Sequence, residues 1–288
     1  MSLLTFVELP EVKEYLRLNV TKPWFQVQAE IKAPPLSASY GMTGTAFDYL
    51  LRFYIEKLNP FAVKAPWVAE SSLEMLEEDP PERHILRRAR RIVQTAKEHY
   101  QSYLGSKREK KPSEELIRAS VGLAQLDLFY RIGLLDLIRV EKAVVEDLSN
   151  LLALVDPANF KAKRTCVLNP TFGSASELVG GADADLFLDG TLIDFKTTKH
   201  LEMKRDIFNQ LFGYYCLSHI GRIRGCRSKV TAIAVYYARY GILYRLPISS
   251  FVDQRFPAVL KWFQGRAAAL QTRRLERLQV MFGGSFDL

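Results

Sequence analysis

Hydrophobic and polar residues alternate over residues 178–188 and again over 191–197, with an Asp-Gly pair between the two runs. An Asp-Gly pair in this position predicts a β-hairpin with a two-residue turn, because both turn positions favour positive φ. Such a turn pairs Leu188 with Thr191, and opposed residues share a face of the sheet. The register therefore predicts an apolar face of Ala184, Leu186, Leu188, Ile193 and Phe195, and a charged face on which Asp185 opposes Asp194 and Asp183 opposes Lys196.

The pattern of the C-terminal half indicates further strands and two helices. We expect strands over residues 164–168, 178–188, 191–197, 230–237 and 241–246, and helices over 202–219 and 249–280. This series predicts the α/β class, with a mixed central β-sheet flanked by helices.

The N-terminal half is predominantly helical by the same criterion. We expect a short helix over 9–18, a strand over 24–31, and a helix that opens near Gly44. A helical insertion follows over residues 69–155, with breaks at 79–81 and 105–112. Its second half starts after Ser113, where two glutamates favour the positive end of a helix dipole. These boundaries divide the chain into an N-terminal segment (1–68), a basic helical insertion (69–156) and a core region (157–288).

Composition indicates an ordinary globular protein, with 48% hydrophobic and 25% charged residues. The length suits one large domain or two closely packed ones. The longest apolar runs, 148–155 and 231–238, are far shorter than the roughly 20 residues that span a bilayer. The N-terminus lacks the basic region and cleavage site of a signal peptide. We therefore expect a cytoplasmic protein that is not in a membrane.

Positive charge is concentrated in one segment of the insertion. The chain has a formal charge of +8, and residues 82–111 contain ten Lys or Arg against three Glu. A second basic stretch covers residues 261–277. Either stretch is a solvated helix face or a track for a phosphate backbone.

Several other classes of site are not indicated. The three cysteines are widely spaced and form no disulfide framework or zinc pattern, and the four histidines do not cluster at a metal-ligand spacing. The sequence contains neither a Gly-x-x-x-x-Gly-Lys-Ser/Thr phosphate loop nor a Gly-x-Ser-x-Gly elbow. An ATPase or helicase activity within this chain is therefore not expected.

The charged face of the hairpin needs compensation. Like charges directly opposite one another on a sheet cost up to roughly 1 kcal/mol when exposed. A divalent cation offsets this repulsion, and Mg²⁺ favours one or two carboxylates together with water and phosphate oxygens. Lys196 would then orient a water or stabilise charge on a phosphate. The alternative is a solvated hairpin face with incidental charge.

Three motifs in this order resemble the RecB-like branch of the PD-(D/E)XK nuclease superfamily. They are Gly-x-x-Asp over 180–183, Asp-x-Lys over 194–196 and Gln-x-x-x-Tyr over 210–214. The resemblance implies a restriction-endonuclease-like core that binds Mg²⁺ or Mn²⁺ through Asp183, Asp194 and the main-chain carbonyl of Phe195. It also implies that Lys196 is catalytic, and that Gln210 and Tyr214 shape the site and contact DNA.

Two features depart from that family or stay open. Members often begin a helix with Gly-x-x-x-His, whose histidine contributes to the metal site; here Asp48 stands at that position, as a metal ligand or a solvated helix residue. Asp183 matches the family spacing, whereas Asp185 is an alternative ligand on the same face. Glu177 is a further possible carboxylate. The iron–sulfur cluster of some members requires four cysteines, which this sequence lacks.

These observations together predict a metal-dependent DNA nuclease that hydrolyses phosphodiester bonds. Arg87, Arg88 and Arg91 would bind the DNA backbone, and protein partners such as a helicase are conceivable. One alternative is a DNA-binding or assembly subunit that is inactive or cleaves only with partners. Another is a metal-dependent enzyme that acts on a different phosphate ester.

Overall fold

A mixed six-stranded β-sheet forms the centre of the protein, as the alternating segments predicted. The computed structural model describes residues 2–108, 110–133, 137 and 139–282. The strands lie side by side in chain order: β1 (Val63–Lys64), β2 (Cys166–Leu168), β3 (Leu186–Leu188), β4 (Thr191–Lys196), β5 (Ala232–Tyr237) and β6 (Ile242–Pro247). Neighbours β1/β2 and β4/β5 run parallel, and the other pairs run antiparallel. The α/β class and the mixed sheet are therefore confirmed.

The predicted hairpin forms, and its register is the predicted one over Leu186–Leu188 and residues 191–193. The expected pairing of Asp183 with Lys196 was wrong, because Asp183 forms a bridge with Thr171 instead. Leu188 pairs with Thr191, and the turn residues Asp189 and Gly190 have φ values of 44° and 90°. The Asp189 carboxylate also accepts the backbone N–H groups of Lys163, Arg164 and Thr165 at 2.6–2.9 Å. One side chain thus fixes the turn and the entry to β2.

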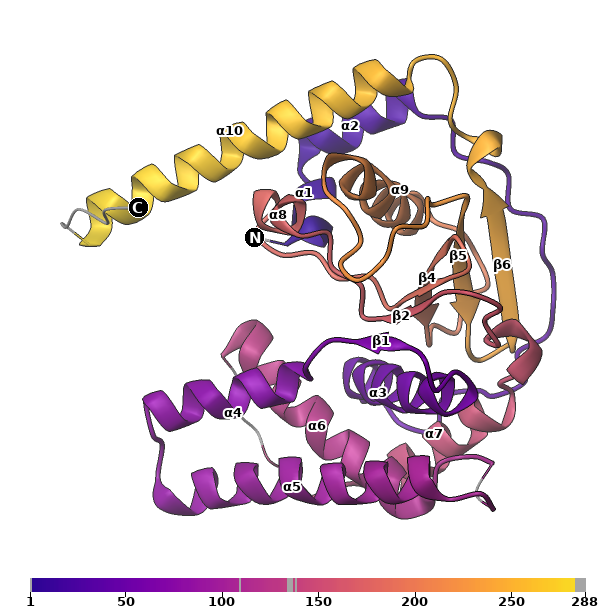
Figure 1. Cartoon of the computed structure of the whole chain (residues 1–288), viewed down its shortest axis with the longest axis vertical. Helices are drawn as coiled ribbons and strands as arrows, with labels where there is room; N and C mark the ends of the chain where they lie inside the picture. Colours follow the sequence, from indigo (N-terminus) through magenta and orange to yellow (C-terminus); the bar gives the residue numbers. More distant parts are fainter. Residues whose placement is uncertain (1, 109, 134–136, 138, 283–288) are drawn as a thin grey trace.

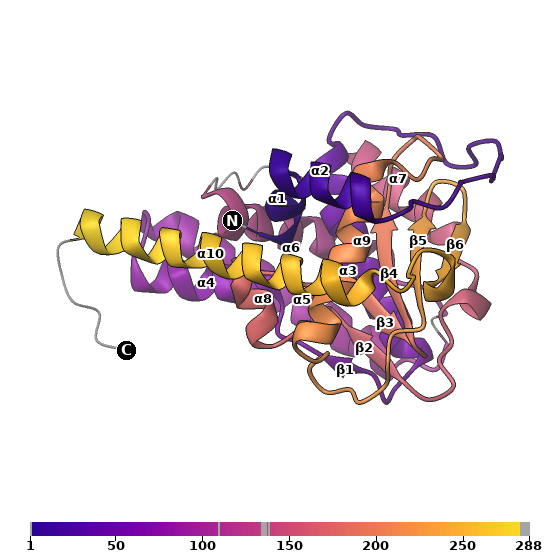
Figure 2. The same ribbon diagram turned by 90° about the horizontal axis from the view of Figure 1, so that it is seen from above.

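Helices cover both faces of the sheet (Figure 1). One layer contains α3 (Tyr40–Leu58), α4 (Val68–Glu78), α5 (Arg83–Gly105), α6 (Glu114–Ile132) and α7 (Lys142–Ala153). The opposite layer contains α1 (Leu3–Val7), α2 (Pro10–Asn19), α8 (Ser174–Leu178), α9 (Arg205–Ile220) and α10 (Phe256–Phe282). The C-terminal half of α10 extends past its layer in both views (Figure 2).

The central strands β2 to β5 are buried on both faces, which the alternation did not predict. Leu186 and Ile193 contact the α3 layer, whereas Phe187 and Leu192 lie in the opposite core. The expected charged face begins only beyond this doubly buried section, at the open end of the hairpin. Ala184, expected beside Leu186, instead belongs to the opposite core, because β3 begins only at Leu186.

Several predicted elements differ from the structure, and the helix expected to open near Gly44 already begins at Tyr40. Residues 24–31 form no strand, because they pair with no neighbour and pack through side chains such as Phe25 against Tyr237 and Tyr244. The expected strand over 178–188 is reduced to β3, since Gly180 and Gly181 adopt positive φ and turn the chain after α8. The C-terminal helix starts at Phe256, after a short 3₁₀ turn over Ile248–Ser250.

The helical insertion has the predicted internal breaks, and Ser113 caps α6 by accepting the N–H of Leu116. Its helices share one apolar core with α3 and with a face of the sheet. In the described part of the chain, no helix combines the length and apolarity that crossing a membrane requires.

Candidate active site

A cavity of about 270 Å³ lies at the C-terminal end of β4. Its walls come from α1, α3, α6, α9 and the segment before β3. The polar and charged side chains that line it are those of Ser2, Thr45, Asp48, Arg131, Asp183, Asp185, Asp194, Lys196, Gln210 and Tyr214. All four aspartates suggested by the sequence, together with the lysine, therefore face one space.

The hairpin register brings the central carboxylates together. Asp194 is 3% exposed, and its Oδ2 lies 2.7 Å from Nζ of Lys196. Asp185 stands one residue before β3 and accepts the backbone N–H of Phe195. Since the N–H and C=O of one strand residue point to the same side, the Phe195 carbonyl is directed toward the Asp185 side.

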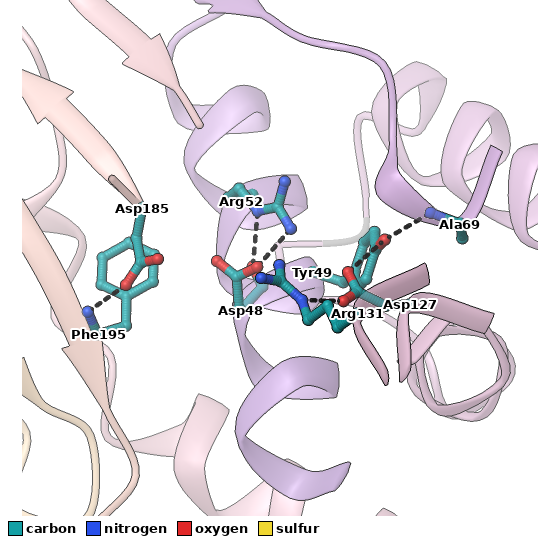
Figure 3. Close-up of polar contacts among 8 residues, drawn as sticks. All are labelled: Asp48, Tyr49, Arg52, Ala69, Asp127, Arg131, Asp185 and Phe195. Atoms are coloured by element: carbon teal, nitrogen blue, oxygen red, sulfur yellow. Dashed lines mark hydrogen bonds and ion pairs between the residues drawn. The ribbon is translucent and has the colours of Figure 1, made fainter. Parts of the chain in front are cut away.

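Asp48 reaches the cavity from α3, although no strand pairing connects it to the other aspartates. Gly44 allows this approach, because a Cβ there would lie only 3.3 Å from Thr197 Oγ1. The Asp48 carboxylate points toward Asp185, just before β3, and forms an ion pair with Arg52 (Figure 3). The helix position that carries histidine in the resembled family is thus inside the site.

Mutual repulsion and burial change the protonation of this cluster. Burial raises the pKa of Asp185 well above its usual value, and the charges of Asp194 and Asp48 add to the shift. Burial likewise raises the pKa of Asp48, in spite of the neighbouring Arg52. For Lys196, burial favours the neutral amine, but Asp194 and Asp185 outweigh it and the pKa is raised. The lysine is therefore an ammonium that can donate hydrogen bonds to a water or a phosphate.

A chain of hydrogen bonds joins the three sequence motifs. Lys196 Nζ donates to Gln210 Oε1 at 3.1 Å, and Gln210 Nε2 donates to the Tyr214 hydroxyl at 3.1 Å. That hydroxyl donates to the Asp183 carbonyl oxygen at 2.8 Å. Gln210 and Tyr214 are buried. Both groups hold Lys196 and the Asp183 segment in place; the predicted DNA contact would have to involve their small exposed edges.

A second polar group connects α3 to the insertion beside the cavity, and the sequence gave no signal for it. Asp127 on α6 accepts a hydrogen bond from Tyr49 at 3.2 Å and forms an ion pair with Arg131 (Figure 3). The Tyr49 hydroxyl also accepts the N–H of Ala69, which links the start of α4. Arg131 on α6 also lines the cavity. The sequence did not indicate this role, because it depends on the packing of α6 beside α3.

Other predicted site residues lie elsewhere. Arg87, Arg88 and Arg91 line a separate cavity between α5 and α6. Glu177 lines a surface hollow near α8 and the end of α9. The choice between Asp183 and Asp185 is still open, because both line the acidic cavity.

The donor set agrees in chemistry with a Mg²⁺ site, but it does not form a closed cage. Within the described residues, no group of three or more His, Cys, Asp or Glu lies close enough to hold a metal ion. Asp48 Oδ1 is nevertheless buried and accepts no hydrogen bond from described residues, and the buried Asp194 Oδ2 is paired with the Lys196 ammonium at 2.7 Å. Mg²⁺ is usually bound by one or two carboxylates plus waters and substrate oxygens, and these two oxygens suit that role.

Comparison of the chain with protein-family models, curated proteins and solved structures found no match. The assignment of function therefore depends on the chemistry of the cavity itself.

Proposed function

We propose that the protein is a metal-dependent nuclease that hydrolyses phosphodiester bonds in DNA. One observation carries the proposal: Asp48, Asp183, Asp185 and Asp194 converge with Lys196 in one cavity. Repulsion among buried carboxylates is costly unless a cation neutralises it, and a phosphodiester brings oxygens that complete the coordination of Mg²⁺.

Each residue has a defined task in this proposal. Asp194, with Asp183 or Asp185 and the Phe195 carbonyl, would hold Mg²⁺ or Mn²⁺, and Asp48 would complete the acidic wall. The bound metal would supply a water of lowered pKa and stabilise charge on the phosphate. Lys196 would orient the attacking water, with Gln210 fixing its position. Arg131 would pair with a phosphate oxygen of the substrate.

The main rival is a DNA-binding or assembly subunit that does not cleave by itself. The pairing of Asp48 with Arg52 favours this rival, because an occupied carboxylate is a poorer metal ligand. A third possibility is hydrolysis of a smaller phosphate ester. Turnover of free nucleotides without binding to long DNA would support that possibility.

The deciding experiment is cleavage of linear, circular and single-stranded DNA in Mg²⁺, Mn²⁺ or EDTA. We expect metal-dependent cutting that Asp194→Asn abolishes, whereas Asp253→Asn, an exposed aspartate, leaves it intact. Arg131→Ala should raise KM more than it lowers kcat. Cleavage of the circular DNA would indicate that the enzyme cuts at internal positions. Absence of cutting by the wild type, with DNA binding retained, would favour the non-cleaving subunit.

Asp185 provides a test that needs no turnover. Its raised pKa means that the folded state prefers the neutral acid, so the stability it contributes at low pH is lost as the pH rises through that value. The groups that face it are Asp194, Asp48, Lys196 and the N–H of Phe195.

In EDTA at neutral pH, Asp185→Asn should therefore raise the melting temperature, by roughly 2–4 °C for each kcal/mol of relieved repulsion. The gain should vanish below about pH 4, the ordinary range of an aspartate pKa. Mg²⁺ should stabilise the wild type, with an affinity that weakens by up to about tenfold per pH unit as Asp185 takes up a proton. A melting temperature that changes neither with Mg²⁺ nor with the Asp185→Asn substitution would contradict this assignment.

A further inference from the structure

The cavity between α5 and α6 is a long basic groove with an apolar floor. Its volume is about 740 Å³, and the described residues of its rim include five arginines (Arg87, Arg88, Arg91, Arg118 and Arg139) against one glutamate, Glu115. The floor is formed by Ile92, Ala119, Gly122 and Val140. The α5 residues that line it run from His84 to His99, which corresponds to about 22 Å along a helix.

This groove does not lead into the acidic cavity. Gln125 lines the groove, whereas Asp127 faces Tyr49 and the active-site side of α6. Residues two positions apart on an α-helix project about 200° apart. Helix α6 therefore stands between the two cavities, and α5 is the helix of this layer farthest from the sheet (Figure 1).

The lining is also unlike that of a single-strand binding track. Such tracks combine positive charge with aromatic side chains on which bases stack, and no Phe, Tyr or Trp is among the described residues that line the groove. Aliphatic side chains between arginines suit a protein segment that carries carboxylates and an apolar anchor.

The chain itself contains such a segment next to the groove. Residues 70–82 hold six acidic residues and no Lys or Arg. On the last turns of α4, Glu74, Glu78 and Asp79 are exposed and form no ion pair within the described chain, and Met75 is 45% exposed beside them. Arg87 and Arg91 likewise form no ion pair with another described residue.

We infer that this acidic end of α4 docks into the α5/α6 groove of a second copy, so that the protein self-associates through complementary charge. Met75 would contact the aliphatic floor, and Glu74, Glu78 and Asp79 would meet the arginine rim. The acidic end and the groove lie on the same α4–α5 hairpin, at one edge of the molecule. Two copies can therefore exchange both contacts about a two-fold axis. This inference does not depend on nuclease activity.

The test is sedimentation velocity of wild type and charge-reversal variants, with melting temperatures as a folding check. The wild type should form dimers at low ionic strength and dissociate at roughly 0.5 M salt, where such contacts are screened. Arg87→Glu with Arg91→Glu, and separately Glu74→Arg with Glu78→Arg, should each weaken the dimer by about tenfold or more. An equimolar mixture of these two variants should dimerise again, because one contact is then native and the other is restored with its charges exchanged.

The matched control is Lys107→Glu with Arg108→Glu, which makes the same charge change on exposed residues just beyond the other end of α5. It should dimerise like the wild type. A wild type that stays monomeric at low salt, a control weakened as much as the groove variant, or a mixture that fails to dimerise would each overturn the inference. If the wild type is monomeric and the Arg87→Glu, Arg91→Glu variant loses DNA binding, the inference is also overturned, because the groove would then bind nucleic acid.

Discussion

Replacement of Lys196 by Ala is expected to lower the rate of DNA cleavage by about 10²- to 10⁴-fold, the range typical of a positioned proton-transfer or charge-stabilising group. The Lys196 ammonium is 2.7 Å from Asp194 Oδ2 and donates to Gln210 at the wall of the acidic cavity. It can therefore act on a water or a phosphate oxygen there. DNA binding should change only a few-fold, because many separate phosphate contacts determine affinity.

The measurement is a single-turnover cleavage assay with saturating enzyme, combined with DNA binding in Ca²⁺ or EDTA. Lys199→Ala is the matched control, since this exposed lysine lies three residues further on and does not line the cavity. Gln210→Ala should give a smaller loss, because it removes only the partner that holds Lys196. An unchanged rate in Lys196→Ala would remove this residue from the catalytic assignment.

Replacement of Asp147 by Ala is expected to destabilise the fold by about 3–5 kcal/mol, because it leaves a buried guanidinium without its counter-charge. Asp147 on α7 and Arg239 after β5 are each 1% exposed and form two hydrogen bonds of 2.8 and 2.9 Å. Arg239 also donates to the carbonyl oxygens of Ala33 and Thr197. This ion pair therefore joins the insertion to the strand end that carries Lys196.

Urea unfolding of wild type and variants measures the effect. The exposed pair of Asp253 and Arg255 is the control, where Asp253→Ala should leave the stability almost unchanged. The double change Asp147→Leu with Arg239→Met should recover much of the lost stability, since an apolar pair of similar volume avoids the buried charge. A loss of under about 1 kcal/mol in Asp147→Ala would show that the pair is not the connection described here.

The sequence predicted those features that depend on neighbours in the chain. The Asp189-Gly190 turn and the two-residue period set the register of β3 and β4, which placed Asp185 and Asp194 at the same end of the hairpin. The helical period placed Gln210 and Tyr214 on one side of α9, and the observed hydrogen bond between them has that origin. Ser113 and the Pro80-Pro81 break defined the ends of insertion helices for equally local reasons.

Local patterns failed where a segment's environment came from distant parts of the chain. Residues 24–31 have a strand-like composition, but they find no backbone partner at the sheet edge and are held by side-chain packing instead. The sequence of α5 indicated a single basic surface. In the folded protein Arg90 and Lys97 pair with glutamates of α4, while Arg87 and Arg91 face the groove toward α6.

The sequence by itself determined the α/β class, the hairpin register and the set of carboxylates with their lysine, because turn chemistry and side-chain periodicity are local properties. Only the tertiary structure decided that Asp48 joins this set, that Arg131 completes the cavity, and that α6 separates it from the α5/α6 groove. Those outcomes depend on how α3 and α6 pack against the sheet and against each other. Such packing is set by the shapes of buried surfaces far apart in the chain, which no short stretch of sequence contains.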